Sequence, residues 1–156
     1  MEFNLFNIII HEPDVALTDY FLAIECIVLA ILLFRVKNKN PILKYIGVFF
    51  YISLALGSLL GGTVHGFFYD KSSLVNTILW KTTLVIIGVT SLFSWILAGA
   101  LINFKHIKIL FYLVLMEFML YSFYVIIENS DFKIAIINYI PSTIFLLVAF
   151  IVNYTK

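Results

Sequence analysis

Five long apolar segments occupy most of this 156-residue chain. They span residues 15–36, 46–68, 74–102, 109–127 and 134–152. A helix needs about 20 predominantly apolar residues to cross a lipid bilayer, and each segment is close to or above that length. Hydrophobic residues make up 63% of the chain and charged residues only 12%, which is more apolar surface than a soluble domain of this size can bury. The sequence therefore predicts an all-α membrane protein, a compact bundle of five transmembrane helices surrounded by the lipid bilayer.

The connections between the segments alternate in charge, and this alternation predicts the orientation. The first and third connections are flanked by bases without any acid: Arg35, Lys37, Lys39, Lys44, Lys105 and Lys108. The region before the first segment and the second and fourth connections hold the acids Glu2, Glu12, Asp14, Asp70, Glu128 and Asp131. Because Lys and Arg in short loops stay in the cytoplasm, we expect the N-terminus outside and Lys156 in the cytoplasm.

Residues 1–13 form a separate extracytoplasmic segment in this interpretation. They are apolar but too few to span a membrane, and Pro13 interrupts any helix that would continue from them. We expect them to lie along the outer membrane surface. Residues 14–156 then form a single domain whose short connections make consecutive helices antiparallel neighbours.

A stripe of small residues runs along one face of the second segment. Its members recur at spacings of three and four: Gly57, Ser58, Gly61, Gly62, His65 and Gly66. Small residues at this spacing let helix backbones approach closely, so Gly57, Gly61, Gly62 and Gly66 predict a helix-packing seam. Two further interpretations stay open. The stripe could dock a second copy or another membrane protein, or it could leave room for a substrate beside Ser58 and His65.

Ionisable side chains within the apolar segments are candidates for function, because each is costly there and usually faces the bundle interior or water. Asp19, His65 and Lys81 lie at similar depths near the outer ends of three different helices. This predicts an outward-facing polar pocket in which Asp19 pairs with Lys81 and His65 can change its protonation. The alternative is that Lys81 extends to the interface while Asp19 lies among the lipid headgroups.

Glu25 and Glu117 fall near the middle of the first and fourth segments. Each must be protonated or have a polar partner, such as Ser58 or Tyr121. Tyr121 and Tyr124 follow Glu117 at spacings of four and seven, so we expect the phenols to share its face and line the same cavity.

Established chemical signatures are missing from the sequence. The three histidines are scattered and no His-x-x-x-His or Cys/His cluster occurs, so we expect no metal and no cofactor. A serine triad, a phosphate loop and a dinucleotide fingerprint are absent, and there is no basic patch for nucleic acid beyond the loops described. We therefore assign no catalytic residue and expect no nucleic-acid partner.

Three runs carry a resemblance to known proteins: EPDVALTDY at 12–20, SLLGGTVHGF at 58–67 and LWK at 79–81. They resemble a family of uncharacterised bacterial polytopic membrane proteins, which implies a multi-pass protein of the bacterial inner membrane with no assigned activity. An acid in the first helix and Ser/His in the second are more distantly similar to the alkaline ceramidase and progestin-receptor-like membrane hydrolases. Those hydrolases carry a histidine pair on a late helix, which this chain lacks.

The predicted function follows from the outward-facing pocket. We expect an integral membrane protein that acts as a pathway component for a small solute, an ion or protons, or as a membrane subunit of a larger assembly. One alternative is a divergent intramembrane lipid hydrolase using His65 with Asp19 and Glu25. A second is a structural partner that assembles through the Gly57–Gly66 stripe.

Overall fold

The structure, a computed structural model, describes residues 3–5, 8–37, 40–128 and 130–155. Its main elements are five helices: α1 Pro13–Arg35, α2 Pro41–Phe67, α3 Leu74–Leu101, α4 Ile107–Ile127 and α5 Phe132–Tyr154. All five are long and apolar enough to cross a membrane, which confirms the five predicted helices. Three charged residues used to predict the orientation, Glu2, Lys39 and Lys156, lie outside the described residues.

Local sequence sets where the helices begin. Pro13 and Pro41 occupy the first turns of α1 and α2, where a missing N–H costs no hydrogen bond and the fixed φ suits the helix. The Asn40 side chain accepts a hydrogen bond from the Leu43 amide at 3.2 Å, and Asp131 accepts one from the Lys133 amide at 3.0 Å. Such contacts satisfy backbone donors at helix starts. Helices α1, α2, α4 and α5 therefore begin a few residues before the apolar runs that predicted them, while α3 begins with its run at Leu74.

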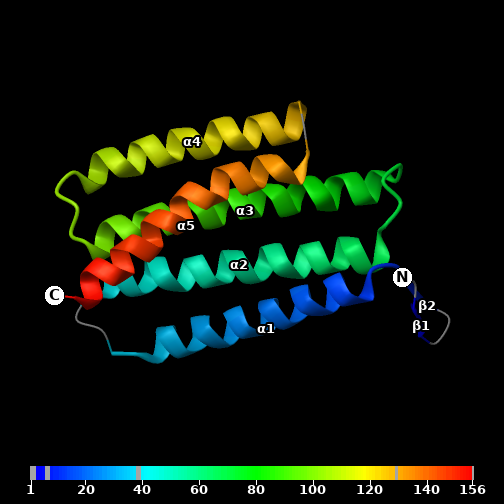
Figure 1. Cartoon of the computed structure of the whole chain (residues 1–156), viewed down its shortest axis with the longest axis horizontal. Helices are drawn as coiled ribbons and strands as arrows, with labels where there is room; N and C mark the ends of the chain where they lie inside the picture. The colour runs from blue at the N-terminus through cyan, green and yellow to red at the C-terminus, as the bar shows by residue number, and fades with distance from the viewer. Residues whose placement is uncertain (1–2, 6–7, 38–39, 129, 156) are drawn as a thin grey trace.

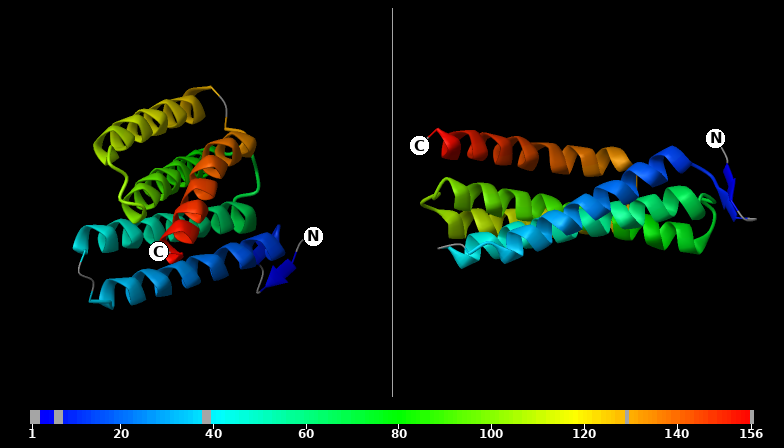
Figure 2. Two further views of the ribbon diagram at one scale, coloured as in Figure 1. Left: turned by 60° about the vertical axis from the view of Figure 1, so that its left-hand side comes forward. Right: turned by 90° about the horizontal axis from the view of Figure 1, so that it is seen from below.

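The helices form a row in which α1 packs on α2, α2 on α3, and α3 on both α4 and α5 (Figure 1). Seen from below in Figure 2, α5 and the N-terminal part of α1 lie on the same side of the α2–α3 pair. We call the end with the α2–α3 and α4–α5 connections the hairpin end. The opposite end, with the α1–α2 and α3–α4 connections, is the lysine end.

A small antiparallel hairpin precedes α1 at the hairpin end. Strand β1, Phe3–Leu5, pairs with strand β2, Ile8–Ile10, with Phe3 opposite Ile10. The backbone amide of His11 then donates to the Gly66 carbonyl at 3.2 Å, which ties this segment to the end of α2. The hairpin adds strands that the sequence interpretation did not predict, while its location on a membrane surface stays a prediction.

The glycine stripe of α2 is used for packing within the chain. A Cβ atom built on Gly62 would lie 3.0 Å from Asp19 Cβ and 3.1 Å from the backbone oxygen of Ala16. Gly61 and Gly66 likewise contact α1, whereas Gly57 faces Ile86 of α3. The opposing face of α1 is also small, with Ala16, Ala23, Cys26 and Ala30 buried. Close approach of two small faces explains how α1 and α2 pack without large interlocking side chains, and a partner binding at Gly61 or Gly62 would have to displace α1.

The remaining surface of the bundle is strongly apolar. Large exposed hydrophobic side chains occur on all five helices, among them Phe21, Phe49, Ile78, Met119 and Leu147. A soluble protein rarely exposes apolar patches of this extent. The exposed faces are therefore suited to contact with lipid.

Candidate functional site

Two cavities lie one above the other and share His65 and Trp80 in their walls. The hairpin-end cavity has a volume of about 440 Å³. It is lined by Glu12, Val64, His65, Tyr69, Lys71, Asn76, Thr77, Trp80, Ser130 and Asp131. The mid-bundle cavity has a volume of about 520 Å³. It is lined by Val15, Asp19, Leu54, Gly57, Ser58, Gly61, His65, Trp80, Thr83, Ile87, Thr90, Phe132 and Tyr139.

The arrangement of the helices explains the mid-bundle cavity. Helices α2 and α3 supply its floor, and α1 and α5, which lie on the same side of that floor in Figure 2, supply its walls. Part of this floor is bare backbone, because Gly57 and Gly61 of α2 have no side chains that would fill the cavity. The stripe is thus compatible with two of the three interpretations made from the sequence, close packing against α1 and open space beside Ser58 and His65.

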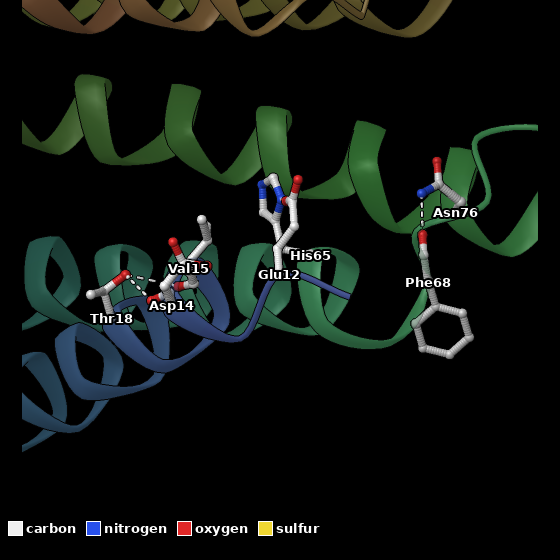
Figure 3. A network of polar contacts seen from close by, with 7 residues as sticks. All are labelled: Glu12, Asp14, Val15, Thr18, His65, Phe68 and Asn76. Atoms are coloured by element: carbon white, nitrogen blue, oxygen red, sulfur yellow. Dashed lines mark hydrogen bonds and ion pairs between the residues drawn. The ribbon is translucent and has the colours of Figure 1, made fainter. Parts of the chain in front are cut away.

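The one ion pair within the described part of the chain joins Glu12 to His65. Figure 3 shows the two side chains next to each other, both directed toward the ribbon of α3. Glu12 immediately precedes α1 and His65 lies in the last turn of α2, so the packing of α1 on α2 brings them together. The Glu12 carboxylate contacts the imidazole directly, and each side chain remains about one third exposed. The pair forms a polar boundary between the two cavities.

Asp19 and Ser58 line the mid-bundle cavity together with His65. Asp19 lies in the second turn of α1, over the glycine stripe, with one carboxylate oxygen 3.1 Å from the position that a Gly61 Cβ would take. Three of the seven candidate residues are therefore brought to one site.

Trp80 separates the two cavities on the α3 side. Its ring meets the His65 ring edge-on with 5.8 Å between centroids, and its indole N–H donates to the Ser130 carbonyl at 2.8 Å. The hydrogen bond fixes the indole, so Trp80 and His65 form a wall that the two cavities share.

The mid-bundle cavity is closed toward the lysine end by contacts between α2 and α3. Thr90 Oγ1 donates to Ser53 Oγ at 3.1 Å, and both residues are buried. Ser94, one turn further along α3, is fully buried and bonded to the Thr90 carbonyl at 2.9 Å. The buried Thr90–Ser53 contact therefore bounds the cavity on the side of the lysine end.

Lys81 belongs to a different set of contacts from the one predicted. Its Nζ donates to the Ile126 carbonyl in the last turn of α4 at 2.5 Å. The last carbonyls of a helix have no partner within the helix, and a cation is favoured there by the helix dipole. Among the residues that the structure describes, Asp19 and Lys81 form no ion pair, because Lys81 extends to α4 while Asp19 lies over α2.

Glu117 and Tyr121 are engaged in the contacts of α3, α4 and α5. Asn138 Nδ2 donates to Glu117 Oε1 at 3.0 Å. Tyr121 packs against Gly88, and its hydroxyl donates to the Leu84 carbonyl at 2.9 Å. Neither residue lines the mid-bundle cavity, and Tyr124 is exposed. In the part of the chain that the structure describes, Tyr121 is buried against α3 while Tyr124 is exposed, so the two phenols do not share one face with Glu117 as predicted.

Glu25 lies apart from the site. It is exposed on the side of α1 opposite to the buried Ala16, Ala23 and Ala30. The set of His65, Asp19 and Glu25 expected for a hydrolase is therefore not assembled. Within the described residues, no three His, Cys, Asp or Glu side chains lie together as metal ligands would.

The rim of the hairpin end carries further polar groups. The hydroxyl and the amide of Ser72 both donate to Asp70 Oδ1, at 2.7 and 2.9 Å, and these hydrogen bonds lower the pKa of Asp70. The His11 ring stacks on Tyr69 with 5.1 Å between centroids. These groups belong to the segment before α1 and to the α2–α3 connection, which also supplies Tyr69 and Lys71 to the lining of the hairpin-end cavity.

The sequence interpretation did not assign Glu12, Trp80 or Asp131 to a site. Glu12 and Asp131 lie just outside apolar segments, so a search for charges within those segments excludes them. Trp80 looks like one of many interfacial aromatics. Glu12 could have been found from its depth, because it precedes the first helix at the end of the bundle where His65 lies in the last turn of the second helix.

Comparison with known proteins gives a family but no activity. A family model, DUF6962, described as a family of unknown function, matches residues 15–156, and the chain belongs to this family. No curated protein and no solved structure matches the chain.

Proposed function

As membership of DUF6962 brings no activity with it, we propose from the geometry that the chain is an integral membrane protein with an outward-facing pocket that admits a small solute. The observation that carries the proposal is the pair of cavities meeting at His65 and Trp80. The first opens among the connections at the hairpin end, and the second reaches past Asp19 to Thr90. Together they form the access half of a pathway, with His65 and its partner Glu12 where the two cavities adjoin.

The charge of the connections supports an extracytoplasmic hairpin end. Bases flank the connections at the lysine end, while acids predominate at the hairpin end, as the positive-inside rule requires for this orientation. A solute would then enter from outside and stop at the Thr90–Ser53 contact. Passage further inward would require α2 and α3 to separate there, through a change within this chain or contact with another subunit.

Thiol labelling tests the proposal with two matched positions. Ser58 faces the mid-bundle cavity, and Thr82 lies at a similar distance from the hairpin end but is exposed on the outside of α3. In a Cys26→Ala background, Ser58→Cys and Thr82→Cys would be treated in intact cells with a membrane-impermeant methanethiosulfonate reagent. Because the thiolate is the reactive form and needs water, we expect labelling of Ser58→Cys and little labelling of Thr82→Cys.

The same variants in inverted membrane vesicles test the orientation. Faster labelling of Ser58→Cys in inverted vesicles than in cells would place the opening on the cytoplasmic side and overturn the proposal. No labelling of either position would show that the cavity has no water-filled connection to one side. Equal labelling of the two positions would show that the reagent reaches the outside of α3 as readily as the cavity, and this result would also overturn the proposal.

A further inference from the structure

The two cavities differ in chemical character, and the difference indicates what kind of molecule fits them. The hairpin-end cavity is bounded by side chains of both charge signs, including Lys71, Glu12 and Asp131. A ligand part that fills it must satisfy a cation and carboxylates at once. A group with one positive and one negative charge meets that requirement better than a group of either sign alone.

The surface that lines the mid-bundle cavity is mainly apolar, although several residues with hydroxyl groups border it. Thr83 Oγ1 donates to the Leu79 carbonyl at 2.9 Å, and Thr90 Oγ1 shares its hydrogen between Ser53 Oγ at 3.1 Å and the Ile86 carbonyl at 3.0 Å. Hydroxyls bonded back to their own helix leave mainly methyl groups facing outward. Leu54, Ile87 and Phe132 add apolar wall, so below the level of Asp19 the cavity favours a hydrocarbon.

The two cavities adjoin at His65 and Trp80, which border both. Because the two rings meet edge-on, a molecule that fills both cavities must run alongside these rings, and only a narrow chain can do so. Ligand sites of about 300–1,000 Å³ hold a molecule of drug-like size, and the two cavities together fall within this range. An elongated molecule with a polar end and an apolar end would occupy both.

We infer that the occupant is a single-chain amphiphile with a zwitterionic headgroup, whose head binds in the hairpin-end cavity and whose hydrocarbon chain extends past His65 and Trp80 into the mid-bundle cavity. This inference rests on the proposed function and specifies its solute. Lys71 attracts the anionic part of the head, and Asp131 and Glu12 the cationic part. The mid-bundle cavity buries the chain, which gives the main apolar contribution to affinity.

Trp80 is a natural reporter for this binding, because it borders both cavities and the only other tryptophan, Trp95, can be replaced by Phe. Bromine quenches indole fluorescence on contact. The probe is a lysophosphatidylcholine with a brominated acyl chain, added to the Trp95→Phe protein in nanodiscs. We expect saturable quenching of Trp80, and weaker quenching by the same brominated chain carrying only a carboxylate.

A pair of leucine variants distinguishes the cavity from the lipid around the bundle. Leu54→Phe adds volume within the mid-bundle cavity, whereas Leu59→Phe adds it on the exposed face of α2. A change of about one methylene in an apolar site alters binding by about tenfold or more. We therefore expect Leu54→Phe to weaken the apparent affinity by about tenfold and Leu59→Phe to leave it unchanged.

Iodide in the aqueous phase separates failure of this inference from failure of the proposed function. If iodide quenches Trp80 and Ser58→Cys is labelled, but the brominated lipid quenches both leucine variants alike, the pocket is open to water and its occupant is not an amphiphile. If Ser58→Cys is not labelled from either side, the proposed function itself fails. Saturable quenching that Leu54→Phe weakens and Leu59→Phe does not would support the inference.

Discussion

Replacing Gly62 by Ala tests how closely α1 approaches α2. The added Cβ would lie 3.0 Å from Asp19 Cβ and 3.1 Å from the Ala16 backbone oxygen, and a backbone atom can move only with its helix. Overpacking of this kind costs about 1–3 kcal/mol. Ala is favoured over Gly within a helix by about 0.5–1 kcal/mol. We therefore expect Gly62→Ala to destabilise the protein by about 1–2 kcal/mol.

Gly57→Ala is the matched control on the same helix. Its added Cβ would lie 3.5 Å from Ile86 Cγ2, an ordinary contact, so the helix preference for Ala dominates. We expect this variant to be as stable as the wild type or more stable by up to about 1 kcal/mol. Gly61→Ala should fall between the two, because its nearest atom is an oxygen of the Asp19 side chain at 3.1 Å, which can rotate away.

The single cysteine provides the assay. Cys26 is buried, so a thiol-reactive fluorogenic dye reports unfolding of the detergent-solubilised protein on heating. A loss of 1 kcal/mol lowers the melting temperature of a chain of this size by about 2–4 °C, so Gly62→Ala should melt roughly 2–8 °C lower. If Gly62→Ala melted at or above the wild-type temperature, α1 could not lie as close to α2 as the structure has it.

Two further experiments test the contacts that Tyr121 and Lys81 make with neighbouring helices. Tyr121→Phe removes the hydrogen bond from the buried hydroxyl to the Leu84 carbonyl and should cost about 1 kcal/mol in the same melting assay, whereas Tyr124→Phe, at an exposed position, should change nothing measurable. In a double-mutant cycle, Asp19→Asn and Lys81→Met should be additive within about 0.5 kcal/mol, because the two side chains contact different helices. A coupling larger than that would restore the predicted Asp19–Lys81 pair.

The helices could be predicted from the sequence because a lipid-spanning helix is defined by length and apolarity alone, without knowledge of its neighbours. The spacing of the glycines likewise predicted close packing along α2. It could not predict which helix each glycine meets, since Gly57 and Gly61 are one turn apart and yet face α3 and α1. The partner depends on the rotation of α2 about its axis, and this rotation is set by the whole bundle.

The error over Lys81 has a similar geometric cause. Counting residues from the helix ends gives a depth along the bundle axis, and by that measure Asp19, His65 and Lys81 do lie at similar levels. Depth says nothing about direction around the axis. Helix α2 lies between α1 and α3 in the row, and Lys81 points away from α1 toward the end of α4. Of the three residues at similar depth, only Asp19 and His65, which lie on the adjacent helices α1 and α2, therefore line the same cavity.

Glu12 shows where a better search would look. The apolar segments were used to select the charges that lie within the membrane, and that selection excludes any residue just before a helix. Pro13 fixes the start of α1 immediately after Glu12, so this carboxylate lies outside the helix and is free to turn inward to the last turn of α2. The Glu12–His65 contact thus joins a residue that precedes the first apolar segment to a residue within the second apolar segment.

In a bundle of antiparallel neighbours, the last residue before one helix and the last turn of the next helix always lie at the same end. Opposite charges at those two positions are therefore a sequence signal for a polar pocket at that end of a membrane protein.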